Sequence, residues 1–320
     1  ISACLVGSEM CIRDRFGVKR WFTDYHRLLD MEEIEGVSIA TPHPVHAEPS
    51  IAAANAGKHI LCEKPMCTTL KDANAMVEAA RKNRVKLFVG YQTRFMPAMI
   101  RMRRLLDESV IGRVHEMCRI GGALQERSDA DWFYSKWAGG GVTLDWTTYT
   151  LYMLRYLMGK TKSVYALADI NAPSKYSVDK PGTMVKMEVE DTISMLMRFE
   201  NGAVGFVYDS WSSSTVHGYI EIVGTDGLLT LEDPWRSKTI ILYTRKITVP
   251  DYARGWHLLD VEPPPGFDPY QARVDHFVEC LLEDKEPVIP GEIGRDVIEV
   301  TEAAYRSVRE NRPIQLPIQP

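Results

Sequence analysis

The stretch Gly57-Lys58-His59-Ile60-Leu61-Cys62-Glu63-Lys64-Pro65 (57–65) decides the fold. A helix-ending glycine is followed by an apolar run and a polar end closed by proline, which predicts a buried strand. Pro65 has no N–H for a sheet ladder, so the chain leaves the sheet there. Ligands bind at the carboxyl ends of strands in open α/β sheets, where an amine can be brought near neutral pKa. Glu63 and Lys64 are therefore candidate site residues. A solvated ion pair at a turn is the alternative.

The sequence on both sides of this stretch alternates between strand and helix patterns. Strands are predicted at 36–40, 60–62 and 85–89, and helices at 47–56, 70–83 and 97–108. Such alternation is typical of βαβ units with a parallel sheet. Each strand ends in a polar loop marked by proline or glycine, so we expect these loops to meet at one sheet edge.

After Gly112 the pattern changes to strands with period two. We expect a strand at 113–120, a helix at 142–158, a polar loop at 171–186, strands from 191 to 243, an irregular segment at 249–269, and helices at 271–282 and 291–309. Met195, Met197 and Phe199 share one strand face. The predicted fold class is α/β: an incomplete Rossmann domain with a parallel sheet (16–112), then an α+β domain with a large open, mostly antiparallel sheet (113–320).

Composition excludes several functional classes. The net charge of -5 over 320 residues argues against a nucleic-acid binder, and no apolar run is long enough to span a membrane. The six cysteines form no CxxC pair, so we expect a reduced, cytoplasmic protein without a metal site.

Four motifs occur in order. They are Ala-Thr-Pro-His-Pro-Val-His (40–46), Glu-Lys-Pro (63–65), Gly-Tyr-Gln-Thr-Arg-Phe-Met-Pro-Ala (90–98) and Gly-Gly-Gly-Val-Thr-Leu-Asp-Trp-Thr-Thr-Tyr (139–149). As a set, from about Phe16 to the C-terminus, they resemble the Gfo/Idh/MocA family of nicotinamide-dependent oxidoreductases, the glucose-fructose oxidoreductase and inositol dehydrogenase group. The resemblance implies NAD or NADP as cofactor and a carbohydrate-like substrate.

The resemblance also implies cofactor contacts from the strand ends. These are Thr41, Pro42 and His46 on the ribose and phosphate side, and Glu63, Lys64 and Gln92 towards the nicotinamide. Arg94 either binds the cofactor or begins the next helix as a structural residue, and both readings stay open.

Lys64, Tyr149 and Asp145 are the predicted catalytic residues. Asp145 and Tyr149 are four positions apart on one predicted helix, so both point the same way. Many family members have histidine where Tyr149 stands, while the subgroup of glucose-fructose oxidoreductase and the dimeric dihydrodiol dehydrogenases uses tyrosine. A phenol titrates at about pH 10 and needs a nearby cation to work near neutrality, which Lys64 could supply. The alternative places Tyr149 in the apolar helix face.

The front of the chain departs from the family pattern. The family begins with a strand, a Gly-x-Gly-x-x-Gly turn and a helix that binds the pyrophosphate, and the early glycines Gly7 and Gly17 do not form that turn. Residues 1–15 resemble adapter read-through, and we expect them to be a non-native leader. The chain looks truncated by one βαβ unit, so we expect it as written to bind NAD or NADP poorly and to be inactive.

The leading functional hypothesis is hydride transfer to or from a sugar, polyol or related hydroxy compound. The alternatives are an NAD-using glycosidase of the same fold and a non-enzymatic sugar- or dinucleotide-sensing regulator. The apolar sheet in the second domain predicts a homo-oligomer, a dimer or a tetramer.

Overall fold

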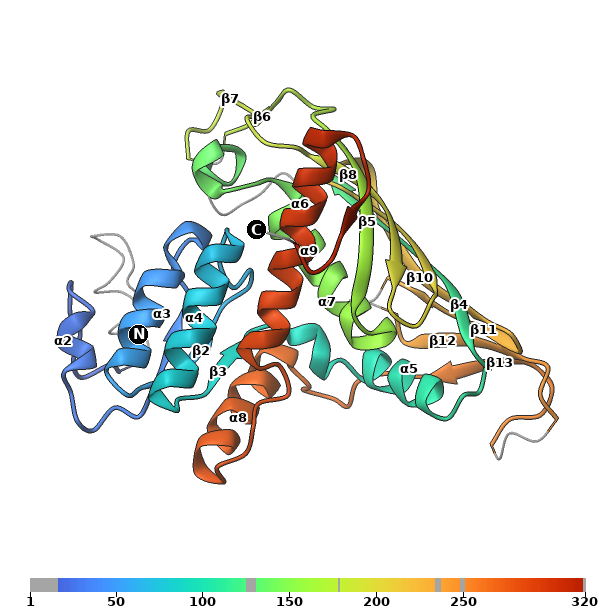
Figure 1. Cartoon of the computed structure of the whole chain (residues 1–320), viewed down its shortest axis with the longest axis horizontal. Helices are drawn as coiled ribbons and strands as arrows, with labels where there is room; N and C mark the ends of the chain where they lie inside the picture. Colours follow the sequence, from blue (N-terminus) through green and yellow to red (C-terminus); the bar gives the residue numbers. More distant parts are fainter. Residues whose placement is uncertain (1–16, 125–130, 178, 234–236, 248–250, 319–320) are drawn as a thin grey trace. The chain divides into compact units, whose positions relative to one another are not determined.

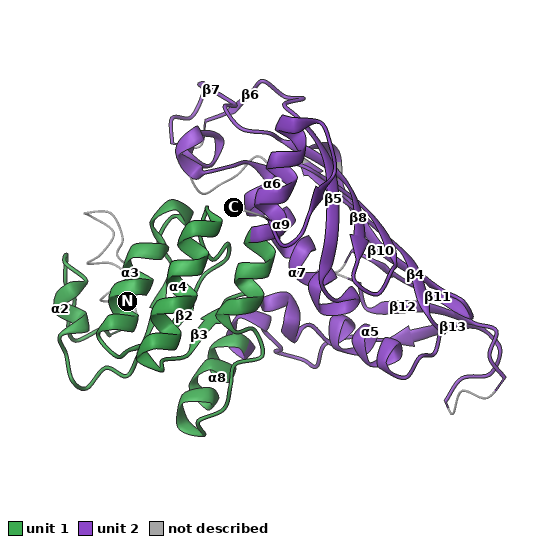
Figure 2. Cartoon of the chain, viewed as in Figure 1, with its two compact units in different colours: residues 1–91, 273–298 green, residues 92–272, 299–320 purple. Residues whose placement is uncertain are grey.

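The computed structural model describes residues 17–124, 131–177, 179–233, 237–247 and 251–318. The predicted leader (1–15) lies outside these residues. The chain forms two compact units: 1–91 with 273–298, and 92–272 with 299–320 (Figure 2). We expected the boundary near Gly112, but the structure divides after Tyr91, and the chain later returns to the first unit. Among the described residues, no helix is both long and apolar enough to cross a bilayer.

The first unit contains a three-stranded parallel sheet in the order β1-β2-β3. Its elements are β1 (Gly36–Ile39), β2 (His59–Cys62), β3 (Leu87–Val89), α2 (His26–Leu29), η1 (His43–Val45), α3 (Ala47–Asn55) and α4 (Leu70–Asn83), with parts of α8 (Pro269–Leu282) and α9 (Gly291–Glu310). Strands and helices alternate as predicted, and this is the Rossmann-type unit (Figure 1).

Helices cover both faces of this small sheet. Phe88 stacks on Phe277 of α8, with ring centroids 6.3 Å apart. The neighbouring Leu87 points to the opposite face, because side chains alternate along a strand. There it contacts Gly291 at the start of α9, where an added Cβ would lie 2.7 Å from the leucine. The sheet is therefore a buried layer whose strands end in loops at one edge.

The second unit is built on a nine-stranded mixed sheet in the order β13-β12-β11-β10-β4-β9-β8-β5-β14. The strands are β4 (Val114–Leu124), β5 (Thr161–Asp169), β8 (Thr192–Phe199), β9 (Val204–Ser210), β10 (Ser212–Gly224), β11 (Gly227–Glu232), β12 (Thr239–Thr244), β13 (Gly255–Asp260) and β14 (Ile314–Gln315). Among the described strand pairs of this sheet, only β4–β9 is parallel. A separate hairpin joins β6 (Ser174–Tyr176) to β7 (Met184–Lys186).

The helical elements of this unit are η2 (Gln92–Phe95), α5 (Pro97–Asp107), η3 (Asp131–Tyr134), η4 (Lys136–Ala138), α6 (Val142–Asp145), α7 (Thr147–Met158) and the later part of α9. They leave one sheet face open. Met195, Met197 and Phe199 are buried, as their shared face predicted, whereas Leu196 on the other face is 55% exposed.

One predicted helix is interrupted. We expected a continuous helix at 142–158, but α6 ends at Asp145 and α7 begins at Thr147. The Tyr149 N–H bonds to the carbonyl of Trp146 at 2.9 Å, a tighter turn than an α-helix makes. The Thr148 hydroxyl donates to the carbonyls of Leu144 and Asp145 at 2.9 and 3.2 Å. Such hydroxyl bonds compete for helix carbonyls and bend helices, which explains the break.

Candidate active site

The predicted strand ends do come together. Ile39, Cys62 and Val89 are partners across the parallel ladder, so the three strands end at one level. The Glu63 N–H donates to the Ile39 carbonyl at 2.9 Å, and the Gly90 N–H to the Cys62 carbonyl at 2.8 Å. The motifs that follow each strand therefore share one edge of the sheet, as their positions predicted.

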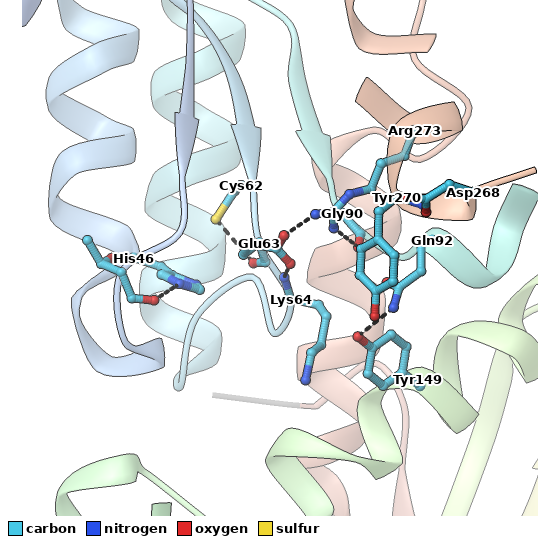
Figure 3. Close-up of polar contacts among 11 residues, drawn as sticks. His46, Cys62, Glu63, Lys64, Gly90, Gln92, Tyr149, Asp268, Tyr270 and Arg273 are labelled. Carbon is cyan, nitrogen blue, oxygen red and sulfur yellow. Dashed lines mark hydrogen bonds and ion pairs between the residues drawn. The ribbon is translucent and has the colours of Figure 1, made fainter. Parts of the chain in front are cut away.

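Glu63 is held by a residue that sequence reasoning missed. Arg273 of α8 forms an ion pair with the Glu63 carboxylate and donates to the Gly90 carbonyl at 2.7 Å (Figure 3). A Cβ at Gly90 would lie 2.5 Å from the guanidinium, so glycine leaves room for it. Only the general rule that a partly buried carboxylate needs a cation could have signalled such a partner. The ion pair neutralises a partly buried carboxylate at the edge of the sheet.

Lys64, Thr41 and Pro42 lie in the loops at this edge, each partly exposed. The Lys64 N–H donates to the Glu63 carboxylate at 3.3 Å, and the Lys64–Pro65 peptide bond is cis. The Thr41 hydroxyl donates to the Val45 carbonyl at 3.3 Å and closes the turn that Pro42 begins.

His46 lies inside the unit. Its side chain is fully buried, with Nδ1 2.8 Å from the Pro65 carbonyl and Nε2 2.6 Å from the Thr41 carbonyl. Burial lowers its pKa, and the two carbonyls and Glu63 oppose that shift. The ring braces two loops of the candidate site. A contact between His46 and the cofactor stays a prediction.

In the second unit, Gln92 and Tyr149 are brought together. Gln92 follows β3 by three residues, and its Nε2 donates to the Tyr149 hydroxyl at 3.0 Å (Figure 3). Gln92 is 1% exposed, and its Oε1 has no hydrogen-bond partner among the described residues. A hydrogen bond donated to a phenol oxygen stabilises the phenolate, so this contact suits Tyr149 for proton exchange.

Asp145 and Arg94 differ in their surroundings. Asp145 is 2% exposed at the end of α6, one turn before Tyr149. The Arg94 guanidinium lies 4.4 Å from the centre of the Tyr156 ring on α7, a cation–π contact. This contact supports the structural reading of Arg94 rather than the cofactor-binding one.

The residues present fit the nicotinamide end of a dinucleotide. The unpartnered Oε1 of Gln92 is a buried acceptor, and a carboxamide N–H₂ is a donor that could satisfy it. No group of His, Cys, Asp and Glu that could hold a metal ion is found in the part of the chain that the structure describes.

Comparison with known proteins decides the family. Residues 7–91 match the oxidoreductase family with an NAD-binding Rossmann fold, and residues 99–230 match the GFO/IDH/MocA C-terminal domain. Together the two matches cover more than half of the chain. The chain belongs to the Gfo/Idh/MocA family of oxidoreductases. The first unit is thus an NAD-binding Rossmann-type domain, and the second is the Gfo/Idh/MocA C-terminal domain.

Relatives in the Gfo/Idh/MocA family are sugar and polyol dehydrogenases. Levoglucosan dehydrogenase of Pseudarthrobacter phenanthrenivorans is 34% identical over 232 residues, which cover 67% of this chain and only 59% of that protein. Myo-inositol 2-dehydrogenase of Thermotoga maritima is 28% identical over 309 residues, 95% of this chain and 86% of that protein.

Solved Gfo/Idh/MocA structures have the same fold. Levoglucosan dehydrogenase in complex with NADH and L-sorbose matches with a TM-score of 0.85 and 26% identity, over 97% of this chain and 87% of the other. The aldose-aldose oxidoreductase from Caulobacter crescentus, complexed with glycerol, matches with a TM-score of 0.83 and 25% identity, over 98% and 89%.

Proposed function

We propose that the chain transfers a hydride between NAD and a CH–OH group of a sugar or polyol. The observation that carries this is the hydrogen bond from the Gln92 amide to the Tyr149 hydroxyl, one turn after Asp145. A hydrogen bond donated to the phenol oxygen stabilises the phenolate, so Tyr149 is suited to exchange a proton with the substrate. Hydride transfer itself is inferred from membership of the oxidoreductase family.

In this mechanism, the bound nicotinamide supplies hydride transfer, and the chain's own residues handle the proton. Tyr149 takes the hydroxyl proton of the substrate, with Gln92 stabilising the phenolate. Lys64 provides a positive charge for the substrate oxygen, and Asp145 fixes the substrate or the lysine. The Arg273–Glu63 pair supports the loop that carries Lys64.

The substrate class follows from the relatives. Five of them are named for levoglucosan, myo-inositol, scyllo-inositol, 1,5-anhydro-D-fructose and D-apiose. All five are small polyhydroxylated rings or sugars, so we propose a substrate of that kind.

A cofactor and substrate screen tests the proposal. The chain, and in parallel a version preceded by a Gly-x-Gly-x-x-Gly nucleotide-binding unit (the extended version), is incubated with NAD or NADP and each alcohol of that set, and with reduced cofactor and the ketone. In the extended version we expect a cofactor absorbance change that Tyr149→Phe strongly reduces. Hydrolysis of a glycoside with no net reduction of NAD would overturn the proposal, as would sugar binding without any reaction.

The open sheet face supports a homo-oligomer. The strand registers place Leu196, Phe206, Tyr219, Tyr243, Trp256 and Leu258 on the same face. Trp256 and Leu258 are 66% and 76% exposed. An apolar face of this extent marks an interaction site, and a second copy of the chain offers a matching surface. We also propose a reducing, cytoplasmic setting, which the spacing of the cysteines in the sequence favours.

A further inference from the structure

The start of α6 is held by a single acidic residue outside the proposed catalytic set. One carboxylate oxygen of Glu190, Oε1, accepts from the N–H groups of Gly141 and Thr143 at 3.0 and 3.1 Å. The main-chain carbonyl of Glu190 accepts from the Val142 N–H at 3.0 Å. Three successive N–H groups at the start of a helix, which have no partner inside it, are thus satisfied by one residue.

A third donor fixes the carboxylate. Tyr305 of α9 donates its hydroxyl to the same Oε1 of Glu190 at 2.8 Å. Burial and the Glu190 charge keep the pKa of Tyr305 well above its usual value, so it stays a donor at neutral pH. We call Glu190 and Tyr305, with the glycines they contact, the α6 clamp.

The glycines before α6 are explained by this clamp. A Cβ at Gly140 would lie 2.0 Å from the Tyr305 hydroxyl, and a Cβ at Gly141 would lie 1.9 Å from the Glu190 carbonyl. No other residue allows the loop to approach so closely. Glycine is therefore required at positions 140 and 141 because Tyr305 and Glu190 lie against the loop, although both are far from it in the sequence.

Main-chain bonds connect the clamp to the proposed proton carrier. The Asp145 N–H bonds to the Gly141 carbonyl at 3.0 Å, the Trp146 N–H to the Val142 carbonyl at 2.9 Å, and the Tyr149 N–H to the Trp146 carbonyl at 2.9 Å. A helix of four residues has no stability of its own. The position of α6 therefore depends on the Glu190 oxygens that accept from the first N–H groups of this helix. The position of the turn that carries Tyr149 depends on them as well, because this turn follows α6 directly.

We propose that Glu190 is a positioning residue for the reaction: by fixing the start of α6, its carboxylate sets the positions of Asp145 and Tyr149. This inference rests on the proposed function. A displacement of about 1 Å at a reacting group can cost about 10²-fold in rate, so the clamp affects turnover more than binding.

Three substitutions of Glu190 test this in the extended version. Glu190→Asp keeps the charge but withdraws the carboxylate, and Glu190→Ala removes it; both should lower kcat by about 10²-fold with the NAD dissociation constant unchanged. Glu190→Gln keeps an acceptor oxygen at the same place and should rescue kcat to within about tenfold of wild type. Thr69→Ala is the matched control, because Thr69 caps α4 in the first unit, where its hydroxyl accepts from the Asp72 N–H. It should lower the thermal midpoint and leave kcat unchanged.

A second readout does not depend on turnover. In crystal structures of Glu190→Asp, the distance from Gln92 Nε2 to the Tyr149 oxygen should lengthen beyond about 3.5 Å, the limit of a hydrogen bond. An unchanged distance, or Asp and Gln variants with equal kcat, would overturn the positioning role. If Tyr149→Phe keeps wild-type turnover, the proton-carrying role of Tyr149 fails instead, and with it the reason for a clamp. If Tyr149→Phe is inactive and Glu190→Ala is not, only the clamp fails.

Discussion

The amide nitrogen of Gln92 lies 3.0 Å from the phenol oxygen of Tyr149, although 57 positions separate the two residues in the sequence. The contact joins the turn that follows β3 to the first turn of α7. The hydrogen bond also gives the Tyr149 hydroxyl a polar partner. A side chain that only filled the apolar helix face would not need such a partner.

In the extended version, Tyr149→Phe should lower turnover by about 10²–10⁴-fold, because removal of a general acid or base typically costs that much. Cofactor affinity should change little, since the phenol acts on the substrate proton. Steady-state kinetics and calorimetry measure the two effects. Tyr165→Phe is the control: Tyr165 lies on β5 and bonds to Asn311, so its loss should not alter turnover. Wild-type turnover in Tyr149→Phe would remove the residue from the mechanism.

Arg273→Met should destabilise the protein by about 3 kcal/mol, because it leaves the partly buried Glu63 carboxylate without its cation. The free energy of unfolding from urea titration measures this. Arg104→Met removes an exposed ion pair with Glu108 and should leave that free energy nearly unchanged. Equal values for the two variants would show that the Glu63–Arg273 pair contributes no more than a surface contact.

Stability should fall as the pH drops below 6.5, the ordinary pKa of histidine, partly because of His46. Burial lowers its pKa in the folded state, so between the two pKa values the unfolded chain binds more protons. The contribution is fully present above pH 6.5 and is lost as the pH falls towards the folded pKa. Unfolding free energies of wild type and His46→Asn, measured on both sides of pH 6.5, should converge as the pH falls. A constant difference would contradict this.

Leu196→Glu together with Leu258→Glu should convert the proposed oligomer to a monomer, because both side chains lie on the exposed sheet face. Light scattering at micromolar concentration gives the mass. Leu282→Glu, at an equally exposed leucine on α8, is the matched control and should leave the mass unchanged. A wild-type chain that is already monomeric would refute the oligomer itself.

The Rossmann-type unit was predictable from local sequence. Short apolar runs bounded by glycine or proline predicted β1, β2 and β3 to within two residues, because such strands are buried on both faces. The edge strand β13 was not predicted and falls in the segment expected to be irregular. Trp256 and Leu258 face outward there, and the flanking prolines at 250 and 263 to 265 suggested a loop.

The candidate site was predicted only where a motif is continuous in the sequence. Glu63, Lys64, Gln92 and Tyr149 stand in local patterns at element ends. Arg273 lies 210 positions from Glu63, and no spacing rule connects an arginine in one helix to a carboxylate in a distant loop. The break at Trp146 depends on which carbonyls the Thr148 hydroxyl reaches, and periodicity does not contain that information.

The path of the chain limits how this protein can be recombined with its relatives. The first unit closes only when residues 273–298 return to it, and Arg273 belongs to that returning segment. A chimera made by exchanging residues 1–91 alone would pair the host's α8 with a foreign Glu63 loop and a foreign β3. Exchange of the first unit between family members therefore requires two crossover segments, and a library built with a single junction after Tyr91 would yield mostly insoluble hybrids.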